Sequence, residues 1–477
     1  MSRPELILIP SPGAGHLVSF NQLARRLVER GNNRFSITIL LINLPFDPPK
    51  SKIGTSDDDD DNLIRYITLP NLNPPPIELL SINWEKYCSD LIASHTDNVR
   101  GVIVKMSGRV AGVIVDLFCT PFIDVANVLD VPSYLFFTSS AAFLCYMLYM
   151  PTLFEKYGRG LRESDPDSIV PGFKNPYPSK YTPPFMLHEL GYMAFLEHGK
   201  RFPGAKGVII NTFAEIEEYP LKSVTDYGWS VYTFGPILDL SGQAHGKQID
   251  EEKQDRIMSW LDAQPESSVV FLCFGSVGSM RPPQMKEVAL GLLQSGARFL
   301  WAVRKPPAEG KKTPTDYSED ELHEILPAEF MALLVEGGKG TVCGWAPQAE
   351  VLAHDAIGGF VSHCGWNSIM EGFWFGRPIV TWPMYAEQRH NAVQLVKEME
   401  LAIELSMDYC KDSGKIIKAD ELERAIKLLM EQDCDLRKRV KVVAEQSRKA
   451  LEEGGSSFIS LGRFIDDVID DKEKADV

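Results

Sequence analysis

The chain lacks the marks of a disulfide-rich or metal-binding protein. Its eight cysteines are scattered over 477 residues, with no CxxC pair and no metal-ligand spacing. We therefore predict no metal site and a reducing compartment. Apolar neighbours predict that four of the cysteines are small core residues: Cys119, Cys145, Cys273 and Cys364.

Long hydrophobic runs are also missing. The N-terminal MSRPELILIP has too short an apolar stretch for a signal peptide, and Pro-Gly punctuation follows at once. The longest apolar region, residues 134–150, is interrupted by Thr138, Ser139 and Ser140 and is shorter than a membrane span requires. The sequence therefore predicts a cytoplasmic protein without a membrane-spanning segment.

The chain has fewer basic than acidic residues. Lysine and arginine number 49 against 65 aspartates and glutamates, for a formal net charge of −16. This balance argues against general binding of nucleic acids and of anionic membranes, which both require basic patches. Part of the charge is the unbroken run Asp57–Asp61, which fits a solvated loop and, as the alternative, a cation site.

Short apolar segments alternate with helical periodicities along the whole chain. In residues 16–30, for example, Leu17, Phe20, Leu23 and Leu27 fall on one helical face, between strand-like segments at 6–9 and 35–42. This rhythm predicts parallel sheets covered by helices, and the length predicts two α/β domains. We place them at 1–239 and 255–456, with a linker at 240–254 and a final helix, 457–477, that packs back on the first domain.

Residues 345–388 read WAPQAEVLAHDAIGGFVSHCGWNSIMEGFWFGRPIVTWPMYAEQ and bring polar groups to the starts of helices. A strand ends at His363, and Asn367 and Ser368 open a helix, where unpaired N–H groups suit a pyrophosphate. Ser276 lies in a second such turn, GSVGS. Taken singly, Asn367 and Ser368 equally fit helix caps, and Ser276 equally fits a plain turn residue.

The same segment offers groups for a base and for sugars. Trp345 lies in a turn before Pro347, where its ring could stack on a base, although a lone tryptophan is usually a core residue. Glu371 could hold vicinal ribose hydroxyls or be a surface carboxylate. Glu387 and Gln388 open another helix and present the acceptor and amide groups that a hexose needs.

His16 is the candidate general base. It follows a Gly-rich turn at the first turn of a helix, whose positive end favours the neutral ring. Asp116 ends an apolar strand, AGVIVD, and would orient the ring if the two meet; the alternative is a helix cap. Most of the other histidines are predicted surface groups: His95, His188, His198, His245, His323 and His390.

The motifs WAPQ, HCGWNS, Glu371 and the final EQ, with PSPGAGH, VDLFC, FFTSS and FGSVGS elsewhere, closely resemble the plant family 1 UDP-glycosyltransferases. The resemblance spans most of the chain. It implies the GT-B fold, in which two Rossmann-like doubly wound domains face each other across a cleft. Two departures are Arg377, where the family usually has a small apolar residue, and the bulky run 373–375.

The resemblance also implies site roles. Trp345 would stack on uracil, with Ala346 and Gln348 at uracil and ribose and Glu371 at the ribose hydroxyls. The phosphates would be held by His363, Asn367, Ser368 and Ser276, and the sugar by Trp366, Glu387, Gln388 and Thr138. A final glutamine such as Gln388 favours glucose. The acceptor-binding residues are expected to be His16, Phe118, Phe122, Tyr146, Met186 and Ala386.

The implied reaction is an inverting transfer with a His16–Asp116 dyad. UDP-glucose is the co-substrate, the acceptor is a small hydrophobic plant phenolic, flavonoid or terpenoid, and the products are a β-glucoside and UDP. The enzyme is expected to be a monomer that needs no metal or other cofactor.

Three alternatives were weighed. A dinucleotide oxidoreductase is disfavoured because the turn GAGHLV lacks the third small residue of GxGxxG. A P-loop nucleotidase is disfavoured because GxxxxGK[ST] is absent. A non-catalytic nucleotide-sugar sensor would keep the 345–388 segment but would not need both dyad residues.

Overall fold

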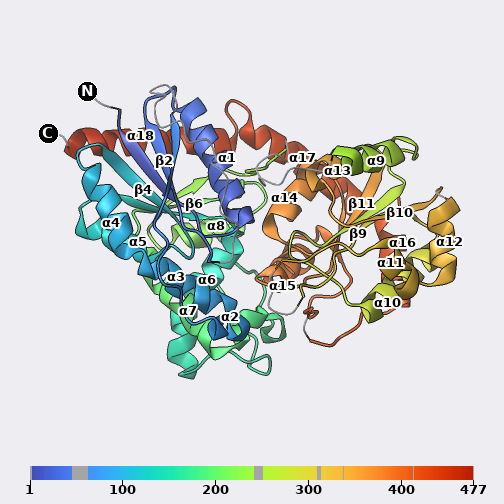
Figure 1. The fold of residues 1–477 in the computed structure, drawn as a ribbon. Helices are drawn as coiled ribbons and strands as arrows, with labels where there is room; N and C mark the ends of the chain where they lie inside the picture. Colours follow the sequence, from blue (N-terminus) through green and yellow to red (C-terminus); the bar gives the residue numbers. More distant parts are fainter. Residues whose placement is uncertain are drawn as a thin grey trace. The chain divides into compact units, whose positions relative to one another are not determined.

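The computed structural model describes residues 3–45, 63–240, 251–308, 313–336, 338–411 and 413–475. The acidic run Asp57–Asp61 and positions 241–250 of the predicted linker lie outside these ranges. The chain divides into two compact units (Figure 1). The first comprises Met1–Tyr177, Phe185–Asp239 and Lys449–Val477, and the second Pro178–Pro184 and Leu240–Arg448.

The first unit is built on one parallel sheet. Within the described residues it has seven strands in the order β3-β2-β1-β4-β5-β6-β7, so the order reverses between β1 and β4. Every strand pair is parallel, which explains why most of these segments are continuously apolar. The strands are β1 Glu5–Ile9, β2 Ser36–Leu41, β3 Ile64–Thr68, β4 Val110–Asp116, β5 Ser133–Phe137, β6 Gly207–Ile210 and β7 Ser230–Thr233.

Helices α1 (Ala14–Arg30) and α18 (Ser456–Ala475) pack against each other and share one core with the sheet. Phe464 of α18 is fully buried and meets Tyr134 edge-on, with ring centroids 4.9 Å apart. The last helix is therefore an integral part of the first unit. The other helices there are α2 Glu78–Ile82, α3 Trp84–Ser94, α4 Thr96–Lys105, α5 Pro121–Val128, α6 Ala141–Tyr157, α7 Glu189–Arg201 and α8 Glu218–Thr225.

The second unit repeats the plan. Among its described residues the sheet has six parallel strands in the order β10-β9-β8-β11-β12-β13, reversing between β8 and β11. The strands are β8 Val269–Cys273, β9 Arg298–Ala302, β10 Gly340–Cys343, β11 Ile357–Ser362, β12 Ile379–Thr381 and β13 Ala402–Glu404. The helices are α9 Glu251–Asp262, α10 Pro282–Ser295, α11 Glu319–Ile325, α12 Ala328–Glu336, α13 Gln348–Ala353, α14 Trp366–Trp374, α15 Gln388–Val393, α16 Ala419–Leu429 and α17 Asp435–Leu451.

The two parallel-sheet α/β domains confirm the predicted fold class, and the four predicted core cysteines are buried. The prediction was wrong for three histidines. His95, His198 and His390 are not surface groups, because at most 2 % of each residue is exposed. In the part of the chain that the structure describes, no helix is both long and apolar enough to cross a bilayer.

Candidate active site

The reversal of strand order in the first unit brings the predicted dyad together. At the carboxyl end of the sheet, Ile9 of β1 pairs with Val115 of β4, so the residues that follow both strands leave the sheet side by side. Such a switch point is where open α/β sheets bind ligands. Asp116 ends β4, and Gly13, with φ of 143°, turns the chain after β1 into α1, which carries His16 in its first turn.

His16 and Asp116 are hydrogen-bonded in the structure. The distance from His16 Nδ1 to Asp116 Oδ2 is 2.9 Å; the carboxylate is fully buried and the imidazole is 29 % exposed. Because a carboxylate only accepts hydrogen bonds, the proton of the neutral ring lies on Nδ1. The basic lone pair of that ring is therefore on Nε2, as a general base requires.

Asp116 is held in turn by a residue that the sequence analysis missed. Ser11 Oγ donates to Asp116 Oδ1, and the backbone N–H of Phe118 approaches the same oxygen at 3.4 Å. Ser11 is 3 % exposed. The sequence feature that could have identified Ser11 is its position in PSPGAGH, the turn between the first strand and His16.

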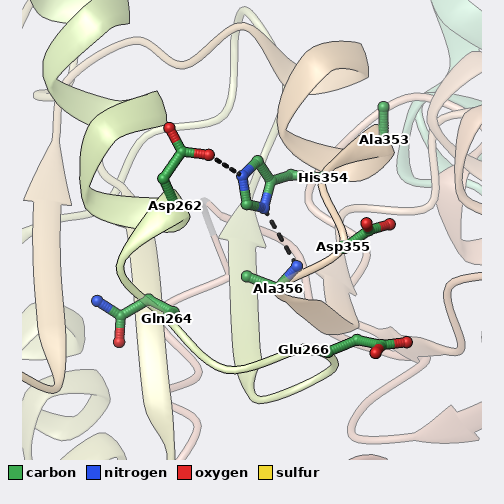
Figure 2. Close-up of a pocket in the computed structure, with 7 residues that line it drawn as sticks. All are labelled: Asp262, Gln264, Glu266, Ala353, His354, Asp355 and Ala356. Atoms are coloured by element: carbon green, nitrogen blue, oxygen red, sulfur yellow. Dashed lines mark hydrogen bonds and ion pairs between the residues drawn. The ribbon is translucent and has the colours of Figure 1, made fainter.

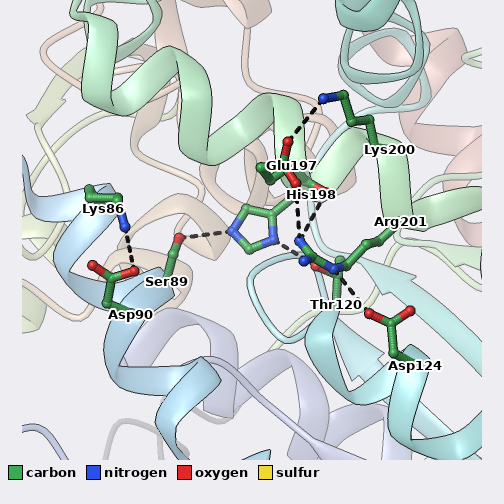
Figure 3. Close-up of polar contacts among 9 residues, drawn as sticks. All are labelled: Lys86, Ser89, Asp90, Thr120, Asp124, Glu197, His198, Lys200 and Arg201. Atoms are coloured by element: carbon green, nitrogen blue, oxygen red, sulfur yellow. Dashed lines mark hydrogen bonds and ion pairs between the residues drawn. The ribbon is translucent and has the colours of Figure 1, made fainter.

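Phe118 lies between the dyad and a second, buried histidine. Its ring meets His16 at 6.3 Å and His198 at 5.5 Å, both edge-on. Figure 3 shows His198 between Ser89 of α3 and Thr120, which precedes α5; Nε2 lies 2.8 Å from Ser89 Oγ and Nδ1 lies 2.7 Å from Thr120 Oγ1. His198 thus supports the loop that carries Asp116 and Phe118.

Three other predicted acceptor residues are core residues here. Phe122 and Met186 are fully buried, and Tyr146 is 2 % exposed and packs against Tyr177. Fully enclosed side chains offer an acceptor almost no surface. Phe118 is half-buried, which leaves it as the predicted aromatic contact with accessible surface in this unit.

In the second unit His363 follows β11 at that sheet's own switch point. It is 5 % exposed, and burial lowers the pKa of its imidazole to about 4, although a hydrogen bond that the ring donates to the backbone of Cys273 opposes the shift. Nδ1 has no hydrogen-bond partner among the described residues. A buried nitrogen without a partner costs free energy unless a ligand satisfies it.

Two glycines make room for this ring. A Cβ on Gly275, after β8, would lie 2.7 Å from His363 Nε2, and one on Gly365 would lie 2.6 Å from the same atom. Gly275 also has φ of 71°, a left-handed conformation that other residues rarely adopt. The GSVGS turn and the HCGWNS turn therefore meet around His363. Ser276, next in the first turn, is exposed.

A carboxamide joins the two helices that carry the predicted nucleoside contacts. Gln348, the first residue of α13, donates through Nε2 to Ser368 Oγ at 2.8 Å and to Glu371 Oε2 at 2.6 Å on α14. Trp345 and Ala346 directly precede α13; the indole is half-buried and Ala346 is 5 % exposed. Asn367 is half-buried beside Ser368, while Trp366 is 2 % exposed.

The turn before α15 is strained and tied to the HCGWNS turn. Ala386 and Cys364 both have left-handed backbones, with φ of 51° and 64°, and such non-glycine residues concentrate at functional sites. Asn391, which the sequence analysis missed, donates through Nδ2 to Cys364 O at 3.0 Å and lies 3.5 Å from Glu387 Oε1. It links the two turns that the sequence assigned to phosphate and sugar.

Gln388 is oriented by the backbone. Its Oε1 accepts from the N–H groups of Met384 at 2.8 Å and Tyr385 at 3.0 Å, so the NH2 group points the other way. Thr138, also predicted at the sugar, is half-buried after β5 in the first unit. In the described residues no group of three or more His, Cys, Asp or Glu side chains could hold a metal ion.

The chain matches the family model "UDP-glucoronosyl and UDP-glucosyl transferase" over residues 208–472, more than half of its length. It is 46 % identical to UDP-glycosyltransferase 71K2 of Pyrus communis, with 98 % of each chain covered. It is 42 % identical to UDP-glucose flavonoid 3-O-glucosyltransferase 6 of Fragaria ananassa, covering 97 % of this chain and 98 % of that one. The solved structure of Medicago truncatula UGT71G1 complexed with UDP-glucose superposes with a TM-score of 0.87 at 41 % identity, with 98 % of each chain covered.

Proposed function

Because this chain belongs to the plant family 1 UDP-glycosyltransferases, enzymes of GT-B fold that use a UDP-sugar as co-substrate, we propose that it is an inverting O-glucosyltransferase. The donor is UDP-glucose, the acceptor is a hydroxyl of a small phenolic, flavonoid or terpenoid, and the products are a β-glucoside and UDP. The protein acts as a cytoplasmic monomer and needs no metal or other cofactor.

The observation that carries the proposal is the 2.9 Å contact between His16 Nδ1 and Asp116 Oδ2. His16 Nε2 removes the proton of the acceptor hydroxyl as its oxygen bonds to the anomeric carbon. The bond from that carbon to the phosphate oxygen breaks on the opposite face, and UDP leaves with the electron pair. Asp116 stabilises the imidazolium that forms, as the carboxylate does in Ser-His-Asp triads.

The leaving pyrophosphate develops negative charge, and the second unit has donors suited to it. His363 contributes Nδ1, which is buried without a hydrogen-bond partner among the described residues and donates when the ring proton lies on it. Asn367, Ser368 and the first turn of α14 contribute further donors. Ser276, in the turn packed against His363, is the fourth phosphate contact.

The nucleoside and sugar are assigned to the neighbouring residues. Trp345 stacks on uracil, Ala346 and Gln348 contact uracil and ribose, and Glu371 accepts from the ribose hydroxyls. The glucose contacts are Trp366, Glu387, Gln388 and Thr138. Gln388 acts through its NH2 group, because its carboxamide oxygen is bonded to the backbone of Met384 and Tyr385.

The proposed acceptor contacts are His16, Phe118 and Ala386. The Fragaria relative is named a flavonoid 3-O-glucosyltransferase, which supports a flavonol as the first substrate to assay. Phe118 and its edge-on neighbours offer an aromatic wall for such a planar ring.

The test is to incubate the protein with UDP-glucose and a flavonol and to measure UDP release. The anomeric configuration of the product is then read from its proton NMR coupling. We expect a β-glucoside, and we expect His16→Ala to abolish turnover while the exposed His323→Ala control keeps it. Full turnover by His16→Ala, or an α-glucoside as the product, would refute the mechanism. If the protein binds the donor but transfers glucose to none of a panel of phenolic and terpenoid acceptors, a non-catalytic sensor is favoured.

A further inference from the structure

The end of α13 is held by one arginine. The guanidinium of Arg377 donates from Nε to the carbonyl of Leu352 at 2.8 Å and from Nη2 to the carbonyl of His354 at 3.0 Å. The carbonyl of Ala353 lies 3.5 Å from the same Nη2. A cation at the carbonyl end of a helix satisfies groups that have no partner within the helix and complements the helix dipole.

Arg377 itself is fixed to the neighbouring helix. Its backbone N–H donates to Gly372 O of α14 at 2.8 Å, and Gly376, with φ of 68°, makes the turn between them. The guanidinium therefore joins the C-terminal end of α14 to the C-terminal end of α13.

The opposite ends of the same two helices are also joined. Gln348, at the start of α13, donates to Ser368 and Glu371 of α14. Leu352 lies four positions after Gln348, which is about 6 Å along a helix. A helix this short has little stability of its own, so its register depends on what holds its two ends.

The side chain of His354 also confines the turn after α13, through contacts outside α14. Figure 2 shows His354 between Asp262 at the end of α9 and the backbone of Ala356. Ala356 N donates to Nδ1 at 3.1 Å, so the ring donates from Nε2 to Asp262 Oδ1, also at 3.1 Å. Arg377 ties this turn to α14, through its guanidinium at His354 O and its backbone N–H at Gly372 O.

Opposing influences act on the charge of this guanidinium. Burial lowers the pKa of Arg377, but Asp355 and Glu266, both on the cavity of about 410 Å³ drawn in Figure 2, oppose that shift. The two carboxylates on this cavity therefore favour the charged guanidinium, and burial opposes it.

We propose that Arg377 is a positioning residue for the sugar-nucleotide: it holds α13 in register with α14, so that the Gln348 carboxamide meets Ser368 and Glu371. The inference rests on the proposed role of these three residues in holding UDP. Arg377 touches neither substrate and acts only through the two helices.

The experiment measures UDP binding by calorimetry and the steady-state kinetics of the full-length protein. We expect Arg377→Val to weaken UDP binding about fivefold to tenfold, which corresponds to the net contribution of roughly one ordinary hydrogen bond. The KM for UDP-glucose should rise by a similar factor, with little change in kcat or in the acceptor KM. Arg377→Lys should recover part of the loss, because one ammonium reaches fewer carbonyls.

Arg437→Val is the matched control. Arg437 grips the end of α16 through the carbonyls of Leu429 and Glu431, both at 2.8 Å, and lies close enough to Arg377 to lower its pKa. Helix α16 carries none of the donor residues. We expect Arg437→Val to lower thermal stability about as much as Arg377→Val does, yet to leave UDP affinity unchanged.

A double-mutant cycle with Gln348→Ala tests the route of the effect. Once Gln348 is gone, loss of Arg377 should weaken UDP binding less than twofold. Additive effects, or unchanged UDP affinity in Arg377→Val, would overturn the inference while leaving the proposed function intact. A wild-type protein that does not bind UDP would overturn both.

Discussion

The buried His198 predicts a specific dependence of stability on pH. The hydroxyl of Ser89 donates to Glu85 O at 2.9 Å, so it accepts from His198 Nε2, and the hydroxyl of Thr120 donates to Nδ1. Protonation of Nδ1 would break the second bond inside a closed core. Burial, reinforced by the charge of Arg201 and partly opposed by Asp116, lowers the pKa of His198 to about 3.

The sign and size of the effect follow from this shift. A histidine in the unfolded chain has a pKa of about 6.5, so below that pH the unfolded state binds a proton that the folded state refuses. The free energy of unfolding therefore falls as the pH drops below 6.5, and the term vanishes above it. At pH 5 it amounts to about 2 kcal/mol, whether the folded pKa is 3 or 4.

His198→Gln removes this term while keeping a side chain that can both donate and accept. We expect the first unit of the wild type to lose about 2 kcal/mol more than the variant between pH 7 and pH 5. Peptide-resolved hydrogen exchange in a urea series is the suitable assay, since a chain with two units need not unfold in one step. His323→Gln, an exposed histidine, should follow the wild type; a wild-type pH slope in His198→Gln would refute the reasoning.

Three further predictions concern the dyad, the donor turn and the last helix. Asp116→Asn should lower kcat by about 10³- to 10⁴-fold in initial-rate assays, because an amide does not hold the ring tautomer or stabilise the imidazolium; a loss below tenfold would contradict this. Gly275→Ala should raise the KM for UDP-glucose about tenfold, since its Cβ would lie 2.7 Å from His363 Nε2 and its φ is 71°; an unchanged KM would contradict it. Phe464→Ala should destabilise the first unit by about 3–5 kcal/mol in the urea series, and equal loss in the second unit would speak against a local effect.

Much of the fold could be predicted because parallel strands buried on both faces are continuously apolar. The predicted segments 6–9 and 35–42 correspond closely to β1 and β2. The three-residue β13 was not predicted, because it is very short and partly exposed. Helices α3 and α4 meet at the buried His95, a break that helical periodicity does not reveal.

The sequence was least informative about which single polar side chains are buried. His198 lies on a helix of mixed composition, and nothing local indicates that Ser89 and Thr120, from two other segments, close around its ring. Arg377 was noticed only as a departure from a familiar pattern, and its contact with the end of α13 depends on how two helices pack. The hydrogen-bond partners of His198 and of Arg377 come from segments that are distant in the sequence, so the residues around each side chain do not indicate them.

The sequence by itself determined which chemical groups are present and at which strand ends they stand, because strand and helix periodicities are local properties of the chain. Only the tertiary structure decided which strand ends are neighbours. Since β1 lies beside β4 and not beside β5, the ring of His16 meets the carboxylate of Asp116, a hundred residues away along the chain. Hydrogen bonds reach about 3 Å, so a site exists only where the packing of distant segments brings its groups within that range.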